Sequence, residues 1–278
     1  MDKNMLHESI RFFLHEDIGR GDLTSESIFD ESDMGKAVFV ARQPFVAAGV
    51  STVAAEVFKV QNEDIKTGNA AEDGTWVQAG ETILNISGPV IDLLKAERIA
   101  LNLLQRLCGI ATLTRQFVDR VQKYKVKITD TRKTTPGLRS LEKYAVQVGG
   151  GYNHRFNLTD GVLIKDNHIA ACGSIREAVD RARQKIPHTI RIEVETDTLK
   201  QVEECLKCGV DIIMLDNMDL VMMEKAVKLI GGKALVEASG GVSIETVENI
   251  AKTGVDVISV GALTHSVNAC DIGMDWLI

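Results

Sequence analysis

The sequence predicts an α/β protein whose second half folds as an open, incomplete parallel α/β barrel of about six or seven strands. Two observations support this prediction. After Gly109, short β-branched runs alternate with helical stretches at spacings of about 20 to 30 residues, which is typical of right-handed parallel crossovers. Polar or charged residues also follow these runs, at the edge where a parallel barrel gathers its active-site groups. A complete barrel needs eight strand and helix units, and the chain holds too few.

The composition is that of an ordinary soluble globular chain. It has 278 residues, 45% hydrophobic and 26% charged, with a formal net charge of -7. No apolar run approaches the roughly 20 residues that span a bilayer, and the polar N-terminus lacks the apolar core of a signal peptide. Five scattered cysteines fit reduced thiols better than a disulfide framework, so we expect a cytoplasmic protein. General nucleic-acid binding needs a broad cationic surface, which an acidic chain does not favour.

Residues 1–108 are predicted to form a separate N-terminal domain. Apolar residues at helical spacing predict an opening helix that ends near Gly19. Ser51 is predicted to cap a helix that runs to Phe58. A glycine turn between two apolar runs predicts a β-hairpin within residues 73–86. The other expected elements are strands at 37–41 and 45–48 and a long helix at 91–107.

Residues 109–268 are predicted to form the barrel and to carry catalysis, and the tail at 269–278 is expected to pack back on the first domain as a strand. The expected strands lie at 126–129, 161–165, 190–195, 211–215, 234–238 and 257–260. The expected helices lie at 113–124, 141–148, 175–185, 198–208, 219–230 and 244–253.

A concentration of positive charge follows the first barrel strand. The stretch Asp130 to Arg139 reads DTRKTTPGLR, a polar loop closed by a proline and glycine turn. Loops of this kind often display binding groups. In an acidic protein such a cluster predicts an anionic ligand, because its cations alternate with Thr, Pro and Gly rather than forming a solvated helical face. Its cations and those of the next two segments are Arg132, Lys133, Arg139, His154, Arg155 and Lys165.

Small residues follow the last two barrel strands. Ser239, Gly240 and Gly241 come after one strand, and Val260, Gly261 and Ala262 come after the next. Residues of this size let backbone N–H groups approach a phosphate, and barrel enzymes often bind phosphate at this position. Either tripeptide alone fits a simple tight turn, but the two on consecutive strands together predict a phosphate site.

Several motifs resemble the quinolinate phosphoribosyltransferase family, and they extend over essentially the whole chain. In addition to the stretch from Asp130, they read GGGYNHR from Gly149, DGVLIKDNH from Asp160, LDN from Leu215, EASGG from Glu237 and VGALTH from Val260. Two more lie earlier, EDIGRGDLT from Glu16 and ERIALNLLQ from Glu97. The resemblance implies transfer of phosphoribose from phosphoribosyl pyrophosphate to quinolinate with decarboxylation, in NAD synthesis. It also implies an N-terminal α/β sandwich domain, magnesium, and a homodimer with sites at the subunit interface.

The resemblance also assigns roles to individual residues. It implies that quinolinate binds Arg98, Arg132, His154, Arg155 and Lys165, with Arg98 contributed across the interface. Magnesium is expected on the substrate pyrophosphate, near Glu195 and Asp216, and the catalytic residues implied are Lys133, Lys165, Glu195 and Asp216. The residues implied to bind phosphoribosyl pyrophosphate are Lys133, Glu195, Asp216, Ser239, Gly240, Gly241, Val260, Gly261 and Ala262.

Some alternatives remain open. Lys165 at a strand end also resembles the Schiff-base lysine of a barrel aldolase, but that lysine must be desolvated and Lys165 stands among charged groups. A relative of similar fold, associated with molybdate transport genes, is disfavoured by the full set of arginines. Cys205 and Cys208 have redox or metal-pair spacing but stand alone on a predicted helix. His168 and His265 belong to matching motifs, and each is either functional or a loop residue.

Overall fold

The computed structural model describes residues 2–277 and divides into two compact units. Unit 1 is formed by the chain up to Arg115, by Thr135–Gly150 and by the segment from Val267 onward. Unit 2 is formed by Gln116–Thr134 and Gly151–Ser266. Among the described helices, none is both long enough and apolar enough to cross a membrane.

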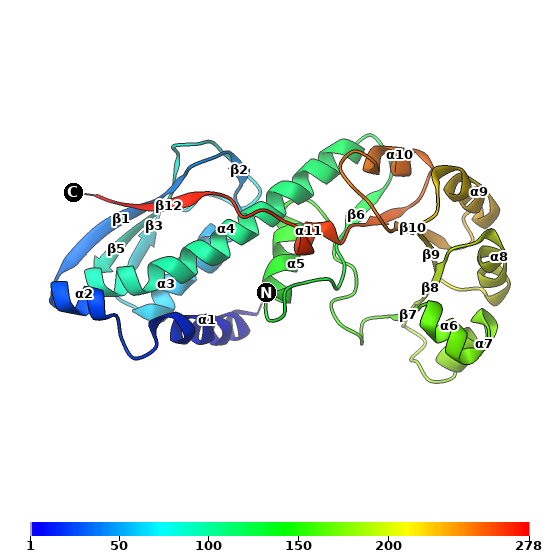
Figure 1. Cartoon of the computed structure of the whole chain (residues 1–278), viewed down its shortest axis with the longest axis horizontal. Coiled ribbons are helices and arrows are strands. Elements are labelled where there is room, and N and C mark those ends of the chain that lie inside the picture. Colours follow the sequence, from blue (N-terminus) through cyan, green and yellow to red (C-terminus); the bar gives the residue numbers. More distant parts are fainter. Residues whose placement is uncertain (1, 278) are drawn as a thin grey trace. The chain divides into compact units, whose positions relative to one another are not determined.

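Unit 1 contains a four-stranded antiparallel sheet with the strand order β12-β1-β5-β3. The final strand of the chain pairs with the first, with Ala37 opposite Trp276 and Ala41 opposite Ile272. Figure 1 shows β12, coloured red, running beside β1, coloured blue. The strands are β1 (Met34–Ala41), β3 (Lys66–Gly68), β5 (Thr82–Pro89) and β12 (Ile272–Trp276).

The first helices of unit 1 agree with the prediction only in part, because the short helix α2 was not expected and one predicted cap is wrong. The opening helix α1 (Lys3–Ile18) ends at Gly19 as predicted, and Asp22 caps α2 (Leu23–Ile28). The prediction that Ser51 is a helix cap is wrong. The helical segment starts one residue earlier, after Gly49 with φ 85°, as a π-helix η1 (Val50–Ala54) that continues into α3 (Ala55–Gln61). Glycine adopts this left-handed conformation without steric cost and so takes the cap position.

The β-hairpin predicted within residues 73–86 is also wrong. Strand β4 (Trp76–Val77) pairs with β2 (Phe45–Val46), whereas β5 pairs with β1 and β3. The physical reason is that β5 is hydrogen-bonded along both edges, so it has no free edge for β4.

The long helix α4 runs without interruption from Val90 to Val121. The sequence predicted two helices separated near Gly109, because glycine is a poor helix former. Instead Gly109 lies inside the helix, where a close contact requires it: a Cβ added there would stand 2.2 Å from the backbone oxygen of Asn268. After the loop that follows β6, helix α5 (Arg139–Val148) completes unit 1.

Unit 2 is the incomplete parallel barrel that the sequence predicts. Its six strands follow the order β6-β11-β10-β9-β8-β7, and all pairs are parallel. The end strands β6 and β7 do not pair with each other, so the barrel is open. A parallel bridge from Tyr152 to Thr129 adds the segment before His154 to the free edge of β6. The strands are β6 (Lys127–Thr129), β7 (Val162–Ile164), β8 (Ile192–Thr196), β9 (Ile212–Asp216), β10 (Leu235–Ser239) and β11 (Val257–Ser259).

Helices α7 to α10 flank the outer side of this sheet (Figure 1). The sequence did not predict α6 and α11, which are too short to show a full period of apolar residues. The helices are α6 (Asp166–Cys172), α7 (Ile175–Arg183), α8 (Leu199–Cys208), α9 (Leu220–Ile230), α10 (Val247–Lys252) and α11 (Ala262–His265).

Candidate active site

A cavity of about 540 Å³ lies at the carboxyl ends of the unit 2 strands. We call it the front cavity. It gathers ten of the predicted site residues from separate strands and loops, because parallel strands bring their carboxyl ends to one edge. These ten are Arg132, Lys133, His154, Arg155, Lys165, Glu195, Asp216, Ser239, Gly240 and Gly241.

Two guanidinium groups define the cationic side of the front cavity. Arg132 Nε is buried and has no hydrogen-bond partner among the described residues. Arg155 donates to the backbone oxygen of Gly161 at 3.1 Å, and burial together with the charge of Arg132 lowers the pKa of its guanidinium. The two guanidinium charges repel each other, and Arg132 Nε is a buried donor without an acceptor among the described residues. Together these features predict that an anion binds between or beside the two arginines.

Two carboxylates also line the front cavity, Glu195 and Asp216. Lys165 Nζ donates to Glu195 Oε2 at 2.6 Å, which joins the ends of β7 and β8. Asp216 ends β9 and accepts a hydrogen bond from Asn217 Nδ2 at 2.9 Å. Both acids are only partly buried, so each presents oxygens to a ligand in the cavity.

The glycine loop after β10 makes a close backbone approach. Gly240 has φ 94°, and a Cβ added to it would stand 2.2 Å from Asn217 Oδ1 and 2.9 Å from the Asn217 backbone nitrogen. Only glycine fits there, since the position combines a left-handed backbone with no room for a side chain. The loop therefore exposes backbone groups to the cavity, as a phosphate site requires.

The second small-residue loop contacts the Arg132–Lys133 segment through Thr264. The buried Thr264 Oγ1 lies 2.8 Å from the Lys133 carbonyl oxygen and 3.3 Å from that of Gly261. Three predicted phosphate-site residues in this loop do not line the front cavity: Val260, Gly261 and Ala262.

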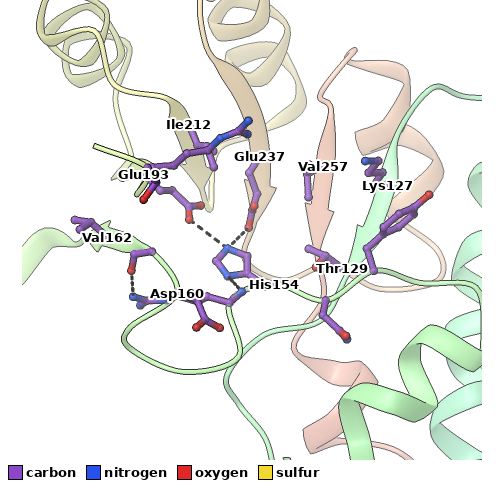
Figure 2. A pocket seen from close by; sticks show the side chains of 15 residues that line it. Lys127, Thr129, His154, Asp160, Val162, Glu193, Ile212, Glu237 and Val257 are labelled. Carbon is purple, nitrogen blue, oxygen red and sulfur yellow. Dashed lines mark hydrogen bonds and ion pairs between the residues drawn. The ribbon is translucent and has the colours of Figure 1, made fainter. Parts of the chain in front are cut away.

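His154 stands at the back of the front cavity, between two buried acids. Figure 2 shows its ring pointing at Glu193 and Glu237, with Nε2 3.2 Å from Glu193 Oε2 and 3.5 Å from Glu237 Oε1. We call these three residues the buried trio. The backbone of His154 is fixed as well, because its N–H donates to Oδ1 of the fully buried Asp130 at 2.9 Å.

The protonation of the buried trio follows from its surroundings. Burial opposes a charged ring, but the hydrogen bonds and charges of Glu193 and Glu237 outweigh it and raise the pKa of His154 to about 10. Burial raises the pKa of Glu193 as well, and the charge of Glu237 adds to this. The two acids thus favour a charged ring, but the Arg155 backbone N–H donates to Nδ1 at 2.9 Å, and this hydrogen bond requires Nδ1 to be unprotonated. In this arrangement the ring is therefore neutral, with its proton on Nε2. The trio has the residue types of a metal site, yet an Nε2 proton facing the acids makes it a hydrogen-bonded cluster.

A second hollow of about 460 Å³, the rear cavity, lies at the amino ends of the same strands. It shares His154, Arg155 and Glu237 with the front cavity, so these side chains line both. The residues that line the rear cavity include the cations Lys127 and Arg191.

The remaining predicted quinolinate residue lies in unit 1. Arg98 is on α4 with 57% of its side chain exposed, and its nearest recorded charge is Glu97 Oε1 at 4.0 Å. The sequence placed Glu193, Asn217 and Glu237 among the polar groups near strand ends, but it assigned none of them to binding or catalysis. One signal was available for the two acids. They stand two residues before Glu195 and Ser239, and residues two apart point to the same side of a strand.

The histidines that the sequence left open have local contacts. His168 Nδ1 accepts the Lys165 backbone N–H at 2.9 Å and so completes the N-terminal cap of α6. His265 Nδ1 lies 2.6 Å from Ser266 Oγ.

Cys205 and Cys208 are buried free thiols on α8. Burial raises the pKa of both, to about 12 for Cys205, so neither is a ready thiolate. We therefore expect Cys205→Ala and Cys208→Ala, together, to keep activity within about threefold of wild type, since both act only as packing groups. Steady-state rates and elemental analysis check this. Loss of activity or of bound metal in a variant with an unchanged circular dichroism spectrum would contradict it.

An open parallel barrel with a cationic cavity and glycine loops at its strand ends is the architecture of an enzyme that acts on phosphorylated, anionic small molecules. Residues 22–108 match the model of the quinolinate phosphoribosyl transferase N-terminal domain, and residues 110–275 match that of the C-terminal domain. The chain therefore belongs to the quinolinate phosphoribosyl transferase family.

Relatives and solved structures agree with this assignment. The chain is 48% identical over 275 residues to a probable nicotinate-nucleotide pyrophosphorylase [carboxylating] of Bacillus subtilis, covering 99% of this chain and 94% of the relative. The corresponding Mycobacterium leprae protein is 44% identical, with 96% of each chain covered. The crystal structure of NadC from Streptococcus pyogenes is 40% identical, with a TM-score of 0.94 and coverage of 100% and 99%.

Proposed function

We infer that the chain transfers phosphoribose from phosphoribosyl pyrophosphate to the ring nitrogen of quinolinate. The products are nicotinate mononucleotide, pyrophosphate and carbon dioxide, a step of de novo NAD synthesis. The observation that carries this is the pair Arg132 and Arg155, which face one cavity without a carboxylate partner among the described residues. Quinolinate is a dianion with adjacent carboxylates, and planar guanidinium groups orient carboxylates better than ammonium groups do.

Phosphoribosyl pyrophosphate fits the other side of the front cavity. Its 5-phosphate is proposed to bind the backbone around Ser239 to Gly241, with Val260, Gly261 and Ala262 supporting it from the next loop. Lys133 and Lys165 are proposed to hold the pyrophosphate. Glu195 and Asp216 are proposed to bind ribose hydroxyls and to stabilise positive charge that develops at C1 as pyrophosphate leaves.

The decarboxylation needs little from the protein. Once the ring nitrogen forms its bond to C1, the ring is a pyridinium cation. The bond between C2 and its carboxylate then breaks, the electron pair stays on C2 beside the cationic nitrogen, and a proton replaces the carbon dioxide. No dedicated base is required, and the protein's part is to orient the ring through Arg132, Arg155 and Lys165.

Magnesium is proposed as the cofactor, and the residues fit it. Glu195 and Asp216 end neighbouring strands and are partly exposed, and Mg²⁺ typically binds one or two carboxylates together with substrate phosphates. When bound, the ion would neutralise charge on the leaving pyrophosphate. We expect chelation followed by dialysis to lower the rate at least about a hundredfold and added Mg²⁺ to restore it, because phosphoryl leaving groups depend on such neutralisation. Full activity of metal-free protein would contradict this.

Two further properties are proposed. A homodimer with Arg98 contributed by the partner is supported by the separate location of Arg98 in unit 1, exposed and without a close acidic partner among the described residues. A cytoplasmic location is supported by the five cysteines, all free thiols.

The experiment that tests the function is direct. Purified protein is incubated with quinolinate, phosphoribosyl pyrophosphate and Mg²⁺, and nicotinate mononucleotide and carbon dioxide are measured. Folded protein that forms neither product would reject the proposal. The aldolase alternative is disfavoured because a Schiff-base lysine is desolvated, whereas the Lys165 side chain is 46% exposed and ion-paired with Glu195.

A further inference from the structure

The buried trio is not explained by the reaction as described above. The side chains of Glu193 and Glu237 are 6% and 4% exposed, and His154 is the nearest ion-pair partner recorded for either. Glu193 Oε1 is buried without a hydrogen bond to any described residue, and Glu237 Oε1 has only the 3.5 Å contact with His154 Nε2. Two buried carboxylates with unmet hydrogen-bonding capacity destabilise a barrel interior, where apolar residues of similar size would pack without that cost.

The trio connects directly to the quinolinate side of the front cavity. Glu193 on β8 and Glu237 on β10 hold the ring of His154 from two directions (Figure 2). The other ring nitrogen, Nδ1, accepts the backbone N–H of Arg155. A shift of the imidazole therefore moves the backbone from which the Arg155 side chain extends, in a segment whose strand-like pairing ends at Tyr152.

The trio also supplies charge where the cavity needs it. Before an anion binds, burial and the charge of Arg132 disfavour the charge of Arg155, and the charges of Glu193 and Asp160 favour it. A buried acid that cannot move away from His154 thus offsets the repulsion between the two guanidinium groups. Held in this way, the arginines need less reorganisation when quinolinate arrives.

We propose that Glu193 and Glu237 are positioning residues for quinolinate: they fix the His154 ring and, through it, hold Arg155 ready for a substrate carboxylate. This inference rests on the proposed function. It assigns a role to two buried acids that contact His154. It also predicts the direction in which quinolinate affinity changes when the charge of either acid is removed. A negative charge near an anion site weakens anion binding by simple electrostatics, so removing it should strengthen quinolinate binding. A positioning role requires the opposite.

The test uses Glu193→Gln and Glu237→Gln, which keep size and remove charge, with the exposed Glu224→Gln on α9 as the matched control. Calorimetry gives the dissociation constants of quinolinate and of phosphoribosyl pyrophosphate, and steady-state rates separate KM from kcat. We expect quinolinate binding to weaken about tenfold or more in each acid variant, the scale of one charge-assisted hydrogen bond. Binding of phosphoribosyl pyrophosphate, the thermal midpoint and all values for Glu224→Gln should change less than about twofold or about two degrees, within surface-mutation effects.

A double-mutant cycle with His154→Gln shows whether the acids act through the histidine. If they do, adding Glu193→Gln to His154→Gln should weaken quinolinate binding by much less than Glu193→Gln does alone. A second substitution, Glu193→Leu, removes the hydrogen-bond acceptor as well, and it should weaken binding at least as much as Gln. If Leu prevents folding, the Gln variants still decide the question.

Three results would overturn the proposal: unchanged or tighter quinolinate binding, equal loss of both substrates, or full additivity in the cycle. Failure of the proposed function is a separate outcome, because it would appear as wild-type protein that neither binds nor converts quinolinate.

Discussion

Nicotinate is expected to be a substrate at least about a hundredfold poorer than quinolinate in kcat/KM, because a site built for two carboxylates loses a few kcal/mol when one is missing. Nicotinate has one carboxylate, so one of the two guanidinium groups in the front cavity would stay unpaired. Arg132 already has a buried Nε without a partner, and burial already disfavours the charge on Arg155. Binding nicotinate would exclude water from both guanidinium groups but would supply only one carboxylate to compensate their two charges.

The measurement is product formation from each acid at saturating phosphoribosyl pyrophosphate and Mg²⁺. Arg155→Ala serves as the matched variant. Arg132→Ala is measured beside it. Whichever of the two arginines pairs with the carboxylate that nicotinate lacks, its removal should lower the rate with quinolinate much more than the rate with nicotinate. Comparable kcat/KM for the two acids in wild-type protein would mean that the cavity does not recognise the second carboxylate.

The front cavity could be predicted from the sequence because its chemistry stands at strand ends. Lys165, Glu195 and Asp216 each follow an apolar run, and parallel pairing brings such positions to one edge whatever the register in detail. The same reasoning places the glycine loop beginning at Gly240.

The buried trio could not be predicted in the same way. Glu193 and Glu237 lie inside their strands, and sequence alone does not distinguish an inward acid from an outward one until the neighbours of the strand are known. Their partner His154 follows a segment that Tyr152 bridges to Thr129 on β6. The sequence around Tyr152 does not resemble a strand, so this bridge could not be predicted. The hairpin prediction was wrong for a similar reason, because both edges of β5 pair with strands that lie elsewhere in the sequence. The close approach of Asn268, which is far away in the sequence, explains why a glycine stands at position 109 inside a continuous helix.

Arg98→Ala is expected to weaken quinolinate binding by about 2 kcal/mol or more, the usual scale for leaving a bound carboxylate without its partner. The side chain is 57% exposed, and its one recorded ion pair is a 4.0 Å contact with the adjacent Glu97, so the substitution should leave stability nearly unchanged. Calorimetry with quinolinate and thermal unfolding measure the two quantities. Because Arg98 belongs to unit 1 and the other quinolinate residues to unit 2, the proposed dimer allows a further test by complementation.

Mixing Arg98→Ala protein with Arg132→Ala protein should restore activity if each site takes Arg98 from the partner subunit. Random exchange of subunits makes half the dimers mixed, and each mixed dimer has one site with both arginines, so about a quarter of wild-type activity should return. The matched control mixes Arg132→Ala with Lys133→Ala. Both of these residues belong to unit 2, so no mixed dimer has an intact site and no recovery is expected. If mass spectrometry shows complete exchange and the first mixture stays inactive, Arg98 acts within its own chain, and the shared site at the interface is wrong.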